Sequence, residues 1–331
     1  MANPTTNGGV TPTTKAFENQ AFLLSHPARN IRILCELEAT AAQLHEQHVN
    51  ATVLFFGSAR AMRRSDWDRE HALLELRERE ASEDCDKTLL RNELARLASI
   101  EWMCEEYEVV ADLAERLTVW ALREDARIAK HASVVGVTRY HPAAEDSAPP
   151  PVNQLLYVCT GGGGGLMMAA NEGASRVKGA RNIGMGISLP LEEGVNPYVD
   201  ASLAFEFHYF FTRKFWMAYH CEALVAVPGG FGTIDELFEV LTLKQTGKIQ
   251  SDLPVVLLGT IYWKTVINWE VVYYYLPDFA FFSCCLFPRP WCSSEPSPRL
   301  MSRVSSSPTQ PRRQRTTAEE AADYIIGRLS R

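Results

Sequence analysis

The sequence predicts an α/β protein: a doubly wound, Rossmann-like parallel sheet flanked by helices, in a single domain with a helical extension and an insertion. Short apolar segments alternate with helical segments between residues 51 and 259. Both faces of each apolar segment look buried, which is typical of parallel strands covered by helices on two sides. Glycine clusters follow several of these segments, and ligands of such sheets bind at the carboxyl ends of the strands.

The expected elements follow from hydrophobic periodicity. Helical spacing from Phe17 to about His48 places apolar residues at Ile31, Leu34, Leu37 and Leu44. Strands are expected within 51–60, 154–160, 182–190, 223–233 and 253–259, a strand running into a helix within 203–222, and further helices within 102–123, 166–177 and 234–248.

The remaining segments differ in composition. Residues 63–96 contain 18 charged residues out of 34, which predicts a solvated helical insertion at about 61–100 of a domain spanning 17–282. Residues 1–16 and the Ser-, Pro- and Arg-rich residues 283–316 are expected to be disordered. A final helix is expected over 317–331, where Thr317 and Glu320 have the spacing of a capping box.

Composition and residue spacing argue against several classes of partner. The 331-residue chain has a net charge of −7, which argues against a protein that coats nucleic acid. It has no basic-then-apolar leader and no run of about 20 apolar residues, so we expect no membrane partner. Eight cysteines without a CxxC pair predict reduced thiols in the cytoplasm, and the histidines lack HxH or HxxxH spacing, so we expect no metal.

The first glycine cluster is TGGGGGLMMAANEGA (160–174). Glycines between a strand and a helix let backbone N–H groups approach an anion, and the helix N-terminus adds partial positive charge. No Gly-Lys-Ser/Thr follows, and the spacing is not GxGxxG with an acid beyond it. The cluster favours a phosphate site, with a flexible glycine turn as the alternative.

The second cluster, PGGFGTIDE (228–236), is more specific. The turn amides and the Thr233 hydroxyl can donate to a phosphate. Glu236 lies one turn into the following helix, where its carboxylate could face the sugar of a ligand. The alternative is an ordinary first-turn acid favoured by the helix dipole.

The pair Arg213-Lys214 opens a helix in FFTRKFWMAYH, where the dipole disfavours positive charge. The pair therefore needs an anionic ligand or a carboxylate partner, unless it faces solvent. The residues around it are interpreted as core rather than as a base-stacking platform: Phe210, Phe211, Phe215, Trp216 and Met217.

These motifs occur in one order: GSAR, TGGGGGLMMAANEGA, IGMGISLP with Glu192 and Asn196-Pro197 beyond it, FFTRK, and PGGFGTIDELFEVLTLKQTGK. In this the chain resembles the LOG (lonely guy) or "lysine decarboxylase-like" family, in its longer bacterial-type branch, over about residues 50–270. The family hydrolyses nucleoside 5'-monophosphates, releasing cytokinin bases from their riboside monophosphates. The resemblance implies cleavage of the bond between an adenine-type base and ribose 5-phosphate, no cofactor, and a homodimer.

The resemblance also implies roles for residues at matching positions. Arg213 and Glu236 would be the catalytic pair. The substrate contacts would be Ser58, Gly162, Gly163, Glu192, Lys214, Gly229, Gly230, Gly232, Thr233 and Thr242.

Two departures from the family pattern leave alternatives open. Five glycines and Met168 replace the usual GGGxxGLM-like loop, and the segment after YWKTVINWE differs until the final helix, as an unusual insertion or a mis-spliced gene would explain. A nucleotide- or cofactor-binding module without catalysis is the second hypothesis, and a non-functional product disrupted near residue 283 is the third.

Overall fold

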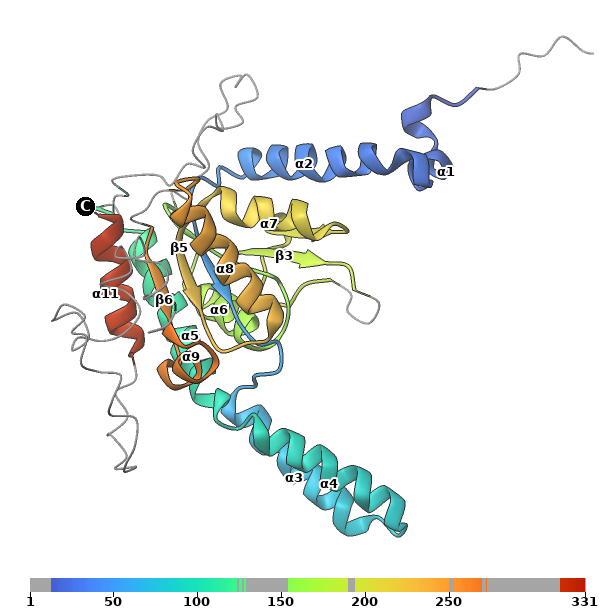
Figure 1. Ribbon diagram of the computed structural model, residues 1–331, viewed down its shortest axis with the longest axis vertical. Helices are drawn as coiled ribbons and strands as arrows, with labels where there is room; N and C mark the ends of the chain where they lie inside the picture. Colours follow the sequence, from blue (N-terminus) through green and yellow to red (C-terminus); the bar gives the residue numbers. More distant parts are fainter. Residues whose placement is uncertain are drawn as a thin grey trace, which may run out of the picture.

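The computed structural model describes residues 13–123, 125–126, 128, 154–189, 194–249, 253–269, 272 and 316–330. Within them, one sheet of parallel strands confirms the predicted fold class (Figure 1). Its strands are β1 (Thr52–Phe56), β2 (Tyr157–Thr160), β3 (Ile183–Ile187), β4 (Ala204–Phe207), β5 (Cys221–Ala226) and β6 (Val255–Leu257).

The strand order is β4-β3-β2-β1-β5-β6. The chain builds outward from β1 to β4 and then returns to place β5 on the other side of β1. The order therefore reverses between β1 and β5, and such a reversal opens a crevice at the carboxyl edge of a parallel sheet. The loops that leave β1 and β5 are GSAR and PGGFGT, two of the motifs that the sequence singles out.

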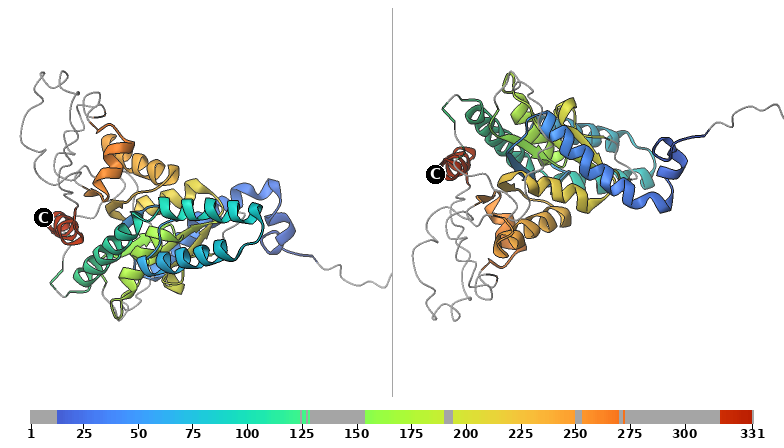
Figure 2. Two further views of the ribbon diagram at one scale, coloured as in Figure 1. Left: turned by 90° about the horizontal axis from the view of Figure 1, so that it is seen from below. Right: turned by 90° about the horizontal axis from the view of Figure 1, so that it is seen from above.

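Helices cover both faces of the sheet, and β1, β2, β5 and β6 contribute side chains to both cores, whereas β3 and β4 contribute to one. Leu54 and Phe56 of β1 join the core under one set of helices, whereas Val53 and Phe55 join the other. The first set is α2 (Arg29–Glu46), α7 (Phe210–Tyr219), α8 (Phe231–Gln245) and α9 (Thr260–Val266), and the second is α5 (Met103–Ala121), α6 (Gly165–Ser175) and α11 (Ala318–Leu329). Figure 2 shows the two layers on opposite sides of the sheet.

The N-terminal helix is shorter than predicted. Residues 16–28 form two 3₁₀ turns, Ala16–Glu18 and His26–Ala28, around the short helix α1 (Gln20–Leu23). Pro27 lies in the first turn that precedes α2, where its missing N–H and fixed φ are tolerated. The predicted apolar face also divides, because Leu44 is buried while Ile31 and Leu34 are exposed.

The charged insertion is a helical hairpin, α3 (Arg64–Glu80) and α4 (Asp84–Ser99), as the composition predicts. A small separate core of Trp67, Leu74, Leu97 and Cys104 closes its base, where the Trp67 indole N–H donates to Leu97 O at 3.0 Å. The hairpin extends away from the sheet (Figure 1). None of the described helices has the length and apolar character needed to cross a bilayer.

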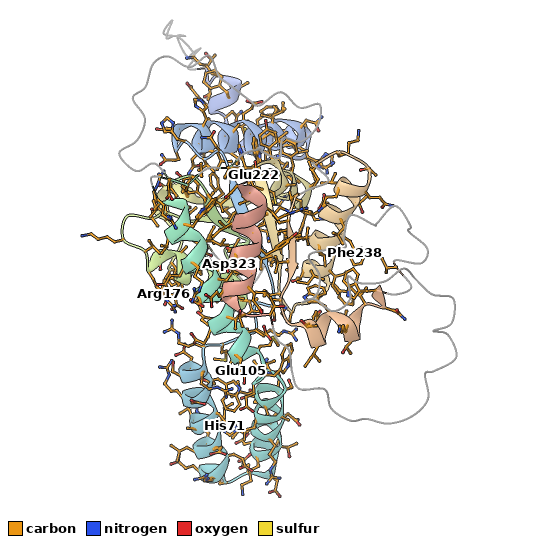
Figure 3. All side chains as sticks on the ribbon, turned by 90° about the vertical axis from the view of Figure 1, so that its left-hand side faces the viewer. His71, Glu105, Arg176, Glu222, Phe238 and Asp323 are labelled. Atoms are coloured by element: carbon orange, nitrogen blue, oxygen red, sulfur yellow. The ribbon has the colours of Figure 1, made fainter. Side chains whose placement is uncertain are left out.

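The C-terminal helix α11 packs along α5 (Figure 3). Thr317 and Glu320 form the predicted capping box in both directions, side chain to backbone each way. A separate short 3₁₀ helix, Ala201–Leu203, precedes β4. The disorder predicted for 1–16 and 283–316 falls almost wholly outside the described residues and stays a prediction.

The packing of α11 on α5 makes a testable contribution to stability. Ile325 is fully buried between the two helices, so Ile325→Ala should lower the free energy of unfolding by about 2–4 kcal/mol through lost burial and a residual cavity. Urea unfolding followed by circular dichroism measures the change. Asp323→Ala, on the exposed face of the same helix, is the control and should shift it by less than about 0.5 kcal/mol.

Candidate active site

Three loops meet at the carboxyl edge of the sheet, after β1, β2 and β5. The backbone N–H of Ser58, after β1, donates to Pro228 O in the loop after β5 at 2.9 Å. The carbonyl of Ser58 in turn accepts from Leu166 N, in the first turn of the helix after β2, also at 2.9 Å. Ser58 therefore joins the two glycine loops on either side of it, and its hydroxyl accepts from Arg60 N at 3.1 Å.

Two glycines of the first run are required by close approach. A Cβ atom on Gly161 would lie 2.5 Å from Nη2 of Arg213, so only a glycine lets the guanidinium rest against this loop. Gly165 has φ +63°, a left-handed conformation, and a Cβ there would overlap the carbonyl of Ser58. The run is therefore shaped by its neighbours and is more than a flexible turn.

A buried amide network fixes the same loop. Asn196 Nδ2 donates to the carbonyls of Gly162 and Gly163 at 3.2 and 3.1 Å, and to Asn171 Oδ1 at 2.9 Å. Asn171 also accepts from the Thr160 hydroxyl at 2.7 Å, and that hydroxyl accepts from Gly162 N at 2.9 Å. These bonds turn the carbonyls of Gly162 and Gly163 toward Asn196, which holds the run in a single shape.

Two helix N-termini at this edge lack side-chain caps. The N-cap residues of α6 and α8 are Gly164 and Gly230, and neither accepts a side-chain hydrogen bond from its helix. The first N–H groups of a helix have no intrahelical acceptor, and together with the helix dipole they form a site for an anion. Thr233, buried in the first turn of α8, has a hydroxyl with no hydrogen-bond partner among the described residues.

Arg213 and Glu236 form an ion pair at the side of this crevice. Arg213 Nη1 lies 3.2 Å from Glu236 Oε1, and both side chains are largely buried, at 8% and 13% exposure. Arg213 Nε donates to Met185 O of β3 at 2.8 Å. The guanidinium thus contacts β3, the glycine run after β2 and the helix after β5, and it orients the Glu236 carboxylate.

Glu236 titrates near neutrality. Burial raises the pKa of Glu236 from its ordinary 4.5 to about 7, although the charges of Arg213 and Lys214 act to lower it. A small open pocket lies beside this carboxyl and is lined in part by Lys214, Met217 and Val240. A carboxyl with a pKa near 7 at the wall of a pocket has the properties of a general acid or base.

Lys214 faces the same helix as Glu236 but binds other carboxylates. Its Nζ lies 2.8 Å from both Asp235 Oδ2 and Glu239 Oε2. Desolvation acts to lower the pKa of Lys214, but the hydrogen bonds and charges of Asp235 and Glu239 outweigh it, so this pKa is raised. The basic pair thus has carboxylate partners on α8, which excludes the solvent-facing alternative for it.

The structure brings most of the predicted site residues together, with two exceptions. Ser58, the glycines of both loops and Thr233 meet at one edge of the sheet, beside Arg213 and Glu236. Thr242 lies farther along α8, exposed, with its hydroxyl donating to Phe238 O at 2.7 Å. Glu192 lies outside the described residues.

The aromatic residues around the pair divide between core and surface. Trp216 and Met217 are buried as predicted, whereas Phe210, Phe211 and Phe215 are 56%, 53% and 38% exposed. The prediction was wrong for these three because helical spacing gives α7 two apolar faces, and only one meets the sheet.

Sequence reasoning also missed the amide network around Asn171 and Asn182, whose side chains share a 2.7 Å hydrogen bond. An asparagine inside a helix that follows a glycine loop was the available signal, since asparagine is a poor former of helix interiors.

Together, the doubly wound sheet and its two glycine-lined helix ends define a Rossmann-like protein with a crevice suited to an anionic ligand. Residues 167–273 match the family model described as "Possible lysine decarboxylase". Two curated relatives from Arabidopsis thaliana, "Cytokinin riboside 5'-monophosphate phosphoribohydrolase LOG1" and LOG3, are 52% and 51% identical over 47 residues, 14% of this chain and 21% of each relative. A "Probable cytokinin riboside 5'-monophosphate phosphoribohydrolase LOG4" from Oryza sativa subsp. japonica is 39% identical over 59 residues, 18% of this chain and 24% of the relative.

These findings support the LOG, or lysine decarboxylase-like, family for this chain, as its motifs predict, over part of its length. The matched stretch is short: the chain spans about a fifth of the length of the curated relatives. The segment matched by the family model contains Arg213, Lys214 and the whole PGGFGTIDE motif.

The raised pKa of Glu236 predicts how stability depends on pH. The folded state binds the proton more tightly than the unfolded state, so this group stabilises the fold below about pH 4.5 and that contribution is lost as the pH rises to about 7. The loss is on the order of 3 kcal/mol. Glu236→Gln should remove this pH-dependent contribution. Urea unfolding at pH 5 and at pH 8 measures the free energy of unfolding of each protein.

The matched control is Glu108→Gln, at an exposed position of α5. Burial also raises the pKa of Glu106, and that group titrates equally in wild type and in both variants, so the comparison isolates Glu236. If wild type and Glu236→Gln lost the same free energy of unfolding between pH 5 and pH 8, the prediction would be wrong.

Proposed function

We propose that this protein hydrolyses the N-glycosidic bond of adenosine 5'-monophosphate or its N6-substituted analogues, giving the free base and ribose 5-phosphate. The observation that carries the proposal is the buried Arg213–Glu236 pair at 3.2 Å, beside two uncapped, glycine-lined helix N-termini. The printed activity of the curated relatives, phosphoribohydrolysis of cytokinin riboside 5'-monophosphates, supports it over the matched stretch.

The phosphate would bind where backbone donors converge. The N–H groups at the starts of α6 and α8 and the Thr233 hydroxyl are donors without side-chain partners, and an anion there gains from both helix dipoles. In this arrangement Gly163, Gly229, Gly230 and Gly232 contact the substrate through the backbone. The backbone N–H groups of Ser58 and Gly162 are bonded to Pro228 O and to the Thr160 hydroxyl, so these two residues would shape the loops around the phosphate. Glu192, Lys214 and Thr242 remain predicted substrate contacts.

Glu236 would act at the ribose. As the bond from C1' to the base breaks, positive charge develops on the sugar, and an ionised carboxylate next to it stabilises that charge. The same carboxylate can orient a water and take its proton as the oxygen joins C1', while the departing base takes up a proton. Its pKa of about 7 suits a group that exchanges a proton near neutral pH.

Arg213 would hold Glu236 rather than transfer a proton. A guanidinium stays protonated at ordinary pH, so it is a poor general acid. Held by Met185 O and close to Gly161, it fixes the carboxylate and supplies the charge that favours the ionised form of Glu236.

Decarboxylation, as the description of the family model suggests, fits these residues less well. Such chemistry runs through a pyridoxal Schiff base on a lysine, which must lose its proton to react. Lys214 at the crevice is paired with Asp235 and Glu239, and these partners raise its pKa and keep it charged.

The proposal predicts a specific kinetic change at Glu236. Glu236→Gln keeps the size of the side chain but removes the carboxylate, so turnover of AMP or N6-isopentenyl-AMP should fall by about 10²-fold or more while binding changes little. Chromatography of base and ribose 5-phosphate measures turnover, and calorimetry measures binding.

Glu108→Gln is the control and should turn over as wild type does. Wild-type binding of AMP without any release of base would replace the proposal with the second hypothesis, a nucleotide-binding module. Full turnover by Glu236→Gln would remove Glu236 from the mechanism.

We also propose that the protein is a homodimer through α7 and α2. Phe211 and Phe215 lie one turn apart on the exposed side of α7, and Leu34, 55% exposed, lies on α2, which packs against α7. Exposed apolar side chains on two packed helices are typical of an interface.

Replacing Phe215 with Asp should therefore dissociate the dimer, because a charge would be buried in the interface. Light scattering should give about 74 kDa for wild type, twice the 37.1 kDa chain, and the monomer mass for Phe215→Asp. Leu89→Asp, at an exposed leucine of the α4 hairpin, should stay dimeric. A monomeric wild type would contradict the proposal.

A further inference from the structure

Helix α2 supplies a carboxylate to the start of α7. Glu36 Oε1 accepts from His208 N at 2.8 Å, and Oε2 accepts from Tyr209 N at 3.4 Å. The hydroxyl of Thr212 also donates to Glu36 Oε2. One side chain, distant by more than 170 residues in sequence, thus binds two backbone N–H groups and one side chain at the first turn of α7.

This turn has no cap of its own. The N-cap residue of α7, Tyr209, makes no side-chain capping bond, and the helix has no acidic residue in its first turn. Its early residues include Arg213 and Lys214, whose positive charges the dipole disfavours there. The Glu36 carboxylate binds the two N–H groups just before the helix and the Thr212 hydroxyl in its first turn, and it places a negative charge at the start of α7.

The carboxylate is held in place by the rest of α2. Thr40, Ala41 and Leu44 are buried farther along the helix, and Gln43 Nε2 donates to Ser202 O, just before β4, at 2.8 Å. The Arg29 guanidinium lies over the Tyr209 ring, 5.7 Å from its centroid. Helix α2 therefore contacts the chain on both sides of β4, at Ser202 before the strand and at Tyr209 after it.

We propose that Glu36 is a positioning residue, which fixes the first turn of α7 and so sets the place of Arg213 against Glu236 and Gly161. Thr212, fully buried and bonded to Glu36, immediately precedes Arg213, and Arg213 N donates to Tyr209 O at 3.3 Å within the same turn. The expected effect on turnover rests on the proposed function, whereas the geometry of the pair does not.

The test compares Glu36→Ala and Glu36→Gln with Glu38→Ala in the full chain. Glu38 is an exposed acid on the same helix with no hydrogen bond or ion pair among the described residues, so it is the matched control. The first readout is the titration of the Glu236 carboxyl by carbon-13 NMR. The charge of Arg213 acts to lower the pKa of Glu236, so a displaced α7 should raise that pKa further.

The second readout is the pH profile of kcat/KM for AMP. Glu36→Ala should lower kcat/KM at neutral pH by about five- to tenfold, because Arg213 would hold Glu236 less firmly, and should shift the acid limb upward. A smaller folded fraction lowers the rate but leaves the position of that limb unchanged, so the shift separates positioning from stability. Glu36→Gln keeps one acceptor oxygen and should show the same changes at smaller size.

The outcomes are distinct. A raised Glu236 pKa in Glu36→Ala but not in Glu38→Ala supports the proposal, even if wild type releases no base, in which case the proposed function alone fails. An unchanged Glu236 titration in Glu36→Ala overturns it, whatever the rate. Should Glu36→Ala not fold, Glu36→Gln decides in the same way.

Discussion

The buried guanidinium of Arg213 is the constraint on which the site depends. A buried charge with five N–H donors needs acceptors, and the protein provides them from separate elements: Met185 O in the middle of β3 and the carboxylate of Glu236 on α8. The third neighbour is Gly161, bare because a side chain there would collide with the guanidinium. The position of β3, the absence of a side chain at Gly161 and the carboxylate of Glu236 are therefore all required by the burial of this guanidinium.

Much of the fold follows from patterns that act locally. Apolar runs that fill both faces of a strand predict a covered parallel sheet, and glycines after β2 and β5 predict where the loops meet. The Arg-Lys pair, in a place that the dipole disfavours, correctly indicates carboxylate partners. Each of these signals depends on residues close together in sequence, so the sequence is enough to interpret them without the structure.

The rest depends on contacts between distant segments. Nothing near Glu36 marks it as a partner of the residues that begin a helix more than 170 residues later, and Asn196 reaches Gly162 and Gly163 only because the fold brings them together. Periodicity likewise places Ile31 and Leu34 at apolar positions of α2 without saying where the sheet ends, and both side chains are exposed. Thr242 matches a family motif, but on α8 it faces solvent rather than the crevice of its own chain.

The two glycine-lined helix ends also limit how this site can change. Donors that belong to the backbone keep their number and charge at every pH, and they cannot be removed by shortening a side chain. A substitution at these glycines can only add atoms. A methyl group at Gly161 would collide with Arg213, and one at Gly165 would collide with Ser58. Variation in affinity for an anion must therefore come from the supports of the loops, such as Asn196, and the choice of ligand from the side chains around them.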